Sequence, residues 1–148
     1  MDKEKSDFLV DLSESKRSEY GKVDFESQTI PQKVFSAIWD LEGEVNNGGF
    51  HQYFANHSAE TAGFVVHALK TIHAESMADL CRAALQCAFG DELPSPKEIQ
   101  RLARNGFSEQ IEDELEMLTK RFLEYPDDLT SLLFDFVQQN QEVFTERP

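Results

Sequence analysis

Apolar residues recur along most of the chain at the three- and four-residue spacing of an amphipathic helix. The clearest stripe follows the i, i+3, i+4, i+7, i+8 template and consists of Leu129, Leu132, Leu133, Phe136 and Val137. Similar stripes run through residues 34–45, 50–54, 64–72, 77–88, 99–103 and 111–122. No segment alternates between apolar and polar positions like a half-buried strand. The pattern therefore predicts an all-α protein, a single compact multi-helix domain of about seven helices.

Several residues mark where the predicted helices begin and end. Pro31 suits the first turn of a helix, and Ser108 suits the N-cap of the helix that follows it. Residues 46–49, Asn-Asn-Gly-Gly, should end the preceding helix, because both residue types tolerate the left-handed conformation found at helix ends. The first 30 residues are polar and weakly patterned. We therefore divide the chain into a weakly ordered N-terminal segment, residues 1–30, and a helical domain, residues 31–148.

The chain carries a strong negative charge that is concentrated near its C-terminus. Its 148 residues include 28 Asp and Glu against 14 Lys and Arg, a formal charge of −14 at pH 7. Residues 107–148 alone hold 11 acids and 3 bases. Direct nucleic-acid binding needs Lys and Arg to neutralise phosphates, and anionic membrane surfaces attract basic segments. The charge therefore argues against both and favours a basic protein partner.

The sequence also indicates a cellular compartment. No apolar stretch follows the charged first residues, so we expect no signal peptide. No run approaches the roughly 18 apolar residues of a membrane span. Cys81 and Cys87 are six residues apart, which matches neither a redox pair nor a disulfide framework. These features favour a cytoplasmic protein that does not enter a membrane.

The residue types that usually carry enzyme chemistry do not form recognisable patterns. The histidines are His51, His57, His67 and His73, and neighbouring ones are at least six residues apart. Helical metal ligands need a spacing of three or four, which only Glu60 has, three residues after His57. The chain has no nucleophile signature and no phosphate loop, and cysteines on an apolar helix usually behave as small buried hydrophobes. We expect no enzyme activity, no metal and no cofactor.

Four carboxylates share one face of the helix that is predicted after Ser108. They are Glu109, Glu112, Asp113 and Glu116, at i, i+3, i+4 and i+7. Their like-charge pairs cost on the order of 1–2 kcal/mol in an exposed helix, yet residues 109–116 contain no Lys or Arg. A face selected only for solubility would interleave both signs. We interpret this face as a partner-binding surface, with a merely solvated surface as the alternative.

Other acids near the C-terminus extend this surface if their helix packs alongside. They are Glu124, Asp127, Asp128, Asp135 and Glu142. One helix row repeats every ~5.4 Å, whereas a DNA strand advances ~3.4 Å per phosphate. A single row is therefore too sparse to imitate a strand, and two adjoining rows come close. Asp127 and Asp128 also suit N-cap positions after Pro126, so both roles stay open for them.

One segment resembles the signature of a known family, the bacterial DNA-mimic proteins. Residues 47–56 match its NGGF-x-Q-[YF]-F-x-N string at Asn47, Gly48, Gly49, Phe50, Gln52, Tyr53, Phe54 and Asn56. Residues 68–75 and 122–129 are similar to two further blocks of the family, although His73 stands where many relatives have Gly. We predict that the signature is structural. Its glycines would reverse the chain, its rings would enter the core, and its two amides would bind backbone groups.

The resemblance implies an all-α fold and, for the characterised type of the family, an acidic dimer that imitates duplex DNA and sequesters a transcription factor. Our hypothesis is a non-enzymatic acidic protein that presents phosphate-like carboxylates to a basic DNA-binding protein, such as a transcription factor, and blocks its DNA binding. We also expect a homodimer. The alternative is an acidic helical interaction module whose partner does not bind DNA. Because the signature contains no carboxylate, family membership alone does not decide between them.

Overall fold

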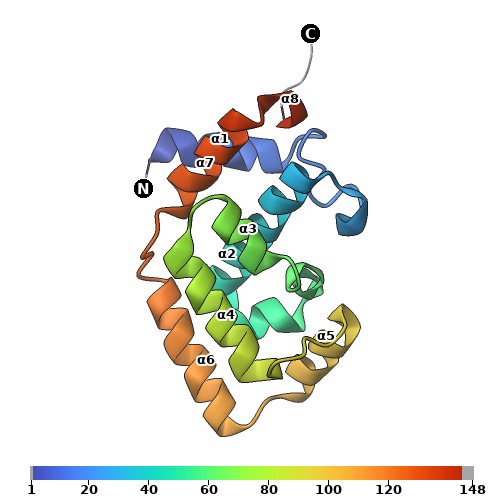
Figure 1. The fold of residues 1–148 in the computed structure, drawn as a ribbon, viewed down its shortest axis with the longest axis vertical. Helices are drawn as coiled ribbons and strands as arrows, with labels where there is room; N and C mark the ends of the chain where they lie inside the picture. Colours follow the sequence, from blue (N-terminus) through green and yellow to red (C-terminus); the bar gives the residue numbers. More distant parts are fainter. Residues whose placement is uncertain (1, 145–148) are drawn as a thin grey trace.

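The computed structural model describes residues 2–144, and its regular structure is helical throughout (Figure 1). Seven helices have seven or more residues: α1 (Lys3–Ser13), α2 (Ile30–Ala55), α3 (Val65–Thr71), α4 (Glu75–Phe89), α5 (Pro96–Asn105), α6 (Glu109–Phe122) and α7 (Leu129–Gln139). Shorter elements are η1 (Phe25–Ser27), η2 (His57–Thr61) and α8 (Gln141–Phe144). No residue from 2 to 144 lies in a strand. The predicted all-α fold with about seven helices is confirmed.

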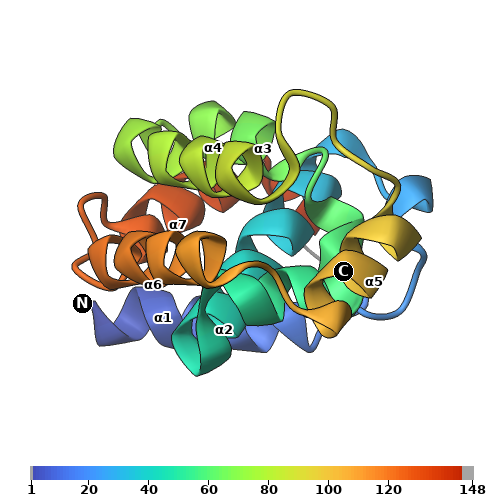
Figure 2. The ribbon, with the colours of Figure 1, turned by 90° about the horizontal axis from the view of Figure 1, so that it is seen from below.

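Helix α2 is the centre of the fold. It begins with a capping box, in which the Thr29 hydroxyl accepts from the Gln32 amide and the Gln32 side chain accepts from the Thr29 amide. The helix packs against η2, α3, α5 and α6, while α4 packs against α3 and α6. Figures 1 and 2 show α4 and α6 lying side by side. None of the described helices is long and apolar enough to cross a membrane.

The Asn46–Gly49 segment separates two helical pieces at a kink, as the sequence predicts, and both pieces belong to α2. The helix continues to Ala55 and is interrupted only at Gly49, where φ is 78° and ψ is −174°. One residue in the left-handed region is enough to bend a helix without ending it. Thr119 of α6 lies against the bend, and its hydroxyl accepts from the Phe50 amide at 3.1 Å. Beyond the bend Phe50, Tyr53 and Phe54 lie in the core, each about 1% exposed.

The two signature amides bind a side chain and not the backbone groups that we expected. Gln52 Nε2 and Asn56 Nδ2 both donate to Glu44 Oε2, at 2.7 and 2.9 Å. Glu44 precedes the bend at Gly49 and both amides follow it, so the three side chains bridge the bend. Gly48 is required for this bridge because a Cβ at that position would collide with the Gln52 side chain.

The N-terminal segment is more regular than its weak pattern predicts. Residues Lys3–Ser13 form α1, which the Asp2 carboxylate caps by accepting from the Lys5 amide. Leu9 and Leu12 are buried, and α1 packs against α7. Two leucines three residues apart lie on one side of a helix. Phe8 adds a T-shaped contact with Phe134 of α7, so apolar contacts attach this mostly polar segment to the domain.

His73 adopts a left-handed conformation, with φ at 69°. Residues with a Cβ rarely occupy this region, whereas glycine does so readily. The backbone between α3 and α4 therefore favours Gly, the residue that we expect here in many relatives. In this chain the backbone at His73 is strained.

Candidate functional site

Helix α6 presents its acidic residues because its apolar side is fixed in the core. The Ser108 hydroxyl accepts from the Ile111 amide at 3.3 Å and caps the helix as predicted. Leu115, Leu118 and Phe122 are buried where α6 packs against α2 and α4. The opposite side of the helix therefore faces solvent and carries Glu109, Asp113 and Glu116, all exposed.

The four predicted carboxylates of α6 are not equivalent. Glu112 turns toward α2, where His51 Nδ1 lies 2.8 and 3.0 Å from its two oxygens. Its side chain is 37% exposed, whereas that of Glu116 is 69% exposed. Lys120 approaches Glu116 at 3.8 Å, a surface pair that contributes about 0–1 kcal/mol. Among the residues that the structure describes, Glu109 and Asp113 form no ion pair.

The acids after α6 are divided between structural and exposed positions. Asp127 accepts from the Met77 amide at 2.8 Å, at the first turn of α4. Asp128 caps α7 by accepting from the Ser131 amide at 3.1 Å, and hydrogen bonds from Ser131 lower the pKa of this carboxyl. Glu124 and Asp135 are exposed.

Helix α7 does not supply a row beside that of α6. It packs mainly against α1, and Figure 1 shows it beyond the C-terminal end of α6 along the long axis. The condition on which a second adjoining row depended, that the two helices pack alongside each other, is therefore not met. The two helices follow one another along the long axis of the molecule instead.

A second row of exposed acids lies on α1, and the sequence analysis missed it. Its members are Glu4, Asp7, Asp11 and Glu14, at i, i+3, i+7 and i+10. The spacing is visible in the sequence, but a weak apolar pattern does not indicate that residues 3–13 form a helix. No ion pair involves these four among residues 2–144. The α1 row is therefore a natural comparison for the α6 face.

Acids of a different kind lie on α2, where they are half-buried. Glu42 accepts from the Tyr125 hydroxyl at 2.8 Å, and burial raises the pKa of its carboxyl. Burial, with the nearby charges of Glu60 and Glu44, raises the pKa of Asp40 to about 6. Sequence spacing alone offers no signal for these environments, because burial depends on elements distant in the chain.

The cysteines are not activated as nucleophiles. Cys81 is buried, and burial raises the pKa of its thiol. Cys87 donates to Glu114 Oε2 at 3.4 Å; burial and this carboxylate raise its pKa to about 11. A thiol must ionise to act as a nucleophile, so both stay protonated near neutral pH. Within residues 2–144, no group of three His, Cys, Asp or Glu side chains is arranged to hold a metal ion.

Comparison with known proteins places the chain in a family. Residues 26–140 match the family described as DMP19-like protein, a range that includes α2 to α7 and well over half of the chain. No curated protein and no solved structure matches the chain significantly. The match covers both the bend at Gly49 and the acidic helix α6. The chain therefore belongs to the DMP19-like protein family, a family of DNA-mimic proteins.

Proposed function

We propose that this protein is a non-enzymatic DNA mimic. The exposed carboxylates of α6 stand in for phosphates and occupy the DNA-binding surface of a basic protein such as a transcription factor. The observation that carries the proposal is the outward face of α6, where Glu109, Asp113 and Glu116 are exposed on a helix anchored from its other side. Membership in a DNA-mimic family supports it.

A rigidly held row of carboxylates favours binding to a basic DNA-binding protein. Because buried leucines hold the backbone of α6, binding has to order only the carboxylate side chains and not the helix that carries them. Charge complementarity then steers encounter and raises the association rate. Glu112 belongs to this face in a supporting position, since its contact with His51 ties α6 to the segment just beyond the Gly49 bend.

The length of the acidic surface favours two copies of the chain. A 14-residue helix spans about 21 Å, and its carboxylates are too widely spaced to match every phosphate of a strand. Glu124 and Asp135 lengthen the row beyond the end of α6 in our proposal. A homodimer would add a second row related by a two-fold axis, which suits a dimeric repressor that reads half-sites. Sedimentation at micromolar concentration tests this point, and a monomer would exclude the dimer.

The experiment that tests mimicry distinguishes the effect of where charges are removed from the effect of lowering the net charge. One variant carries Glu109→Gln, Asp113→Asn and Glu116→Gln, and keeps Glu112 because of its contact with His51. A matched control carries Glu4→Gln, Asp7→Asn and Asp11→Asn, which remove the same charge from the α1 row. Immobilised wild type captures partners from native cell extract, a salt gradient elutes them, and captured proteins are assayed by competition gel shift.

We expect wild type and the α1 control to retain a DNA-binding protein and to displace its DNA. The α6 variant should lose this activity, and binding by wild type should weaken steeply with salt, because exposed charges are screened. If the α6 variant displaces DNA as well as wild type, this face is only a solvated surface. If the captured partner has no DNA-binding activity, the protein is an acidic interaction module of another kind.

A further inference from the structure

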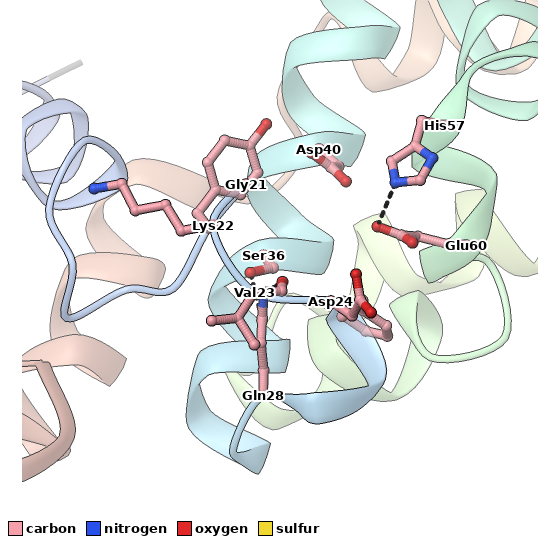
Figure 3. A pocket seen from close by; sticks show the side chains of 11 residues that line it. Gly21, Lys22, Val23, Asp24, Gln28, Ser36, Asp40, His57 and Glu60 are labelled. Atoms are coloured by element: carbon pink, nitrogen blue, oxygen red, sulfur yellow. Dashed lines mark hydrogen bonds and ion pairs between the residues drawn. The ribbon is translucent and has the colours of Figure 1, made fainter.

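A cleft of about 310 Å³ opens on a part of the molecule to which α6 contributes no residue (Figure 3). Residues 20–25 and Gln28 form one wall, the middle of α2 forms another, and η2 forms the third. Its size is near the lower end of the range for small-molecule sites. In Figure 3 the carboxylates of Asp24, Asp40 and Glu60 turn toward the same space.

The cleft is held open by buried hydrogen bonds. Gln28 Nε2 donates to the carbonyl oxygens of Glu19 and Val23, at 3.2 and 3.3 Å. Ser36 of α2 donates to Gln28 Oε1 at 2.7 Å, and both side chains are buried. The loop is therefore fixed to α2 in the absence of any occupant. Binding sites for small ligands are usually preformed in this way.

Asp40 lies in this cleft with a hydrogen bond to Tyr20 but with no matching cation. Among residues 2–144, no Lys or Arg forms an ion pair with it. Lys22 also lines the cleft, but its ammonium donates to the Glu14 carbonyl oxygen and points away from the space in Figure 3. His57 lies beside Glu60, 3.3 Å from its carboxylate, and its side chain is 87% exposed.

This arrangement costs stability, because the hydrogen bond from Tyr20 supplies no countercharge to the Asp40 carboxylate. Burial and the charges of Glu60 and Glu44 raise the pKa of Asp40 to about 6, so the charged form is disfavoured where it stands. A buried charge is normally paired, and groups that lower stability are often retained for binding. A cation in the cleft would supply the missing countercharge.

We propose that the cleft binds a guanidinium or alkylammonium group, with Asp40 as its principal anion and Glu60 as the second. An organic cation fits better than a metal ion, because the described acids are not gathered closely enough to ligate one. Guanidinium and ammonium groups spread several N–H donors over separate acceptors. Tyr20 also lines the cleft, and aromatic rings favour such cations. The proposal is independent of the mimicry proposal.

The test uses agmatine, which carries both cationic groups, and butylurea as its neutral counterpart. Titration of the full-length protein is followed by two-dimensional NMR and by calorimetry. We expect saturable agmatine binding, with amide shifts concentrated in residues 20–28, 36–40 and 57–60, and no binding of butylurea. Asp40→Asn should weaken agmatine binding by about tenfold or more, since it removes a charge-assisted hydrogen bond.

Two further variants distinguish the cleft from general electrostatic attraction. Glu60→Gln should weaken agmatine binding to a smaller extent. Glu42→Gln removes another half-buried acid of α2, outside the cleft, and should leave the affinity within about twofold of wild type. The proposal is overturned if agmatine gives no saturable shifts at millimolar concentration. It is also overturned if Asp40→Asn and Glu42→Gln lower the affinity equally.

A final titration distinguishes the two sources of the cation. The cation is either a free small molecule or an arginine side chain of a partner protein. N-acetyl-arginine-N-methylamide presents the guanidinium with a peptide backbone on both sides. If it binds as tightly as agmatine, the cleft accepts an arginine from a protein. If agmatine binds and the capped arginine does not, the ligand is a free cation.

Discussion

Helices α2 and α6 are neighbours that use their carboxylates in opposite ways. On α2, Asp40, Glu42 and Glu44 are shielded from solvent and engaged by surrounding side chains. On α6, Glu109 and Asp113 are exposed and form no ion pair within the described residues. The same residue types therefore shape a bend or a cleft in one helix and form a charged surface on the other. Acidic composition alone does not distinguish these uses.

The residues of the family signature differ from the residues that mimicry requires. The signature lies at the bend of α2, where its rings are buried and its amides bind Glu44. These positions determine the fold, and none of them presents charge to a partner. The proposed mimic surface lies on α6 and meets the signature only at contacts such as Phe50 with Thr119 and His51 with Glu112. A relative can therefore keep the fold and lose the activity.

The largest effect should follow from removing a core ring of α2. Phe54 is 1% exposed, so Phe54→Ala should lower the free energy of unfolding by roughly 3–5 kcal/mol. Met117→Ala on α6, where the side chain is 55% exposed, should change it by less than about 0.5 kcal/mol. Urea denaturation measures both. A Phe54→Ala variant of wild-type stability that fails to bind its partner would make the signature a recognition surface.

Neutralising Asp40 should stabilise the protein in a pH-dependent manner. The pKa of its carboxyl is raised from 3.8 to about 6, so the penalty for charging it is present above pH 6. This penalty corresponds to about 3 kcal/mol at pH 7. Asp40→Asn should gain up to that amount, and the gain should vanish as the pH falls toward 4. Denaturation across this pH range would contradict the interpretation if the difference did not depend on pH.

The bend at Gly49 should be sensitive to a single methyl group. Gly49 has φ at 78°, and a Cβ there would lie 2.9 Å from Thr119 Oγ1, so Gly49→Ala should cost roughly 1–3 kcal/mol. Gly43 lies in the same helix, with open space around its Cβ position. Gly43→Ala should therefore gain about 0.5–1 kcal/mol. Thermal unfolding of the two variants measures both effects. Equal effects would show that the bend at Gly49 is no more sensitive to a methyl group than the straight part of α2.

The smallest effect on stability should come from the α6 face. The triple variant Glu109→Gln, Asp113→Asn and Glu116→Gln relieves like-charge repulsion but loses the Glu116–Lys120 pair and the favourable dipole interaction of Glu109. These contributions nearly cancel, so the free energy of unfolding should change by less than about 0.5 kcal/mol. Circular dichroism during urea unfolding measures it. A large destabilisation would assign these carboxylates a structural role and would weaken the contrast with α2.

Much of the fold could be predicted because it depends on local pattern. The stripe Leu115, Leu118 and Phe122 indicated which side of α6 is buried, and Ser108 indicated where the helix begins. The Asn-Gly run correctly predicted the break inside α2, but not its geometry. It marks a place where the chain can turn left-handed, and whether the helix then stops or bends depends on contacts such as that between Gly49 and Thr119 of α6.

The site was less predictable, because exposure and pairing arise between distant segments. The sequence by itself determined the all-α fold, the excess of acids and the single face of α6 on which four of them lie, since helical periodicity requires only local spacing. Only the tertiary structure decided which carboxylates are exposed. Glu112 meets His51, 61 residues away, and Asp127 meets the first turn of α4, 50 residues away. Asp40 is half-buried because the Tyr20–Gln28 loop and η2 close around α2, and no local pattern encodes that approach.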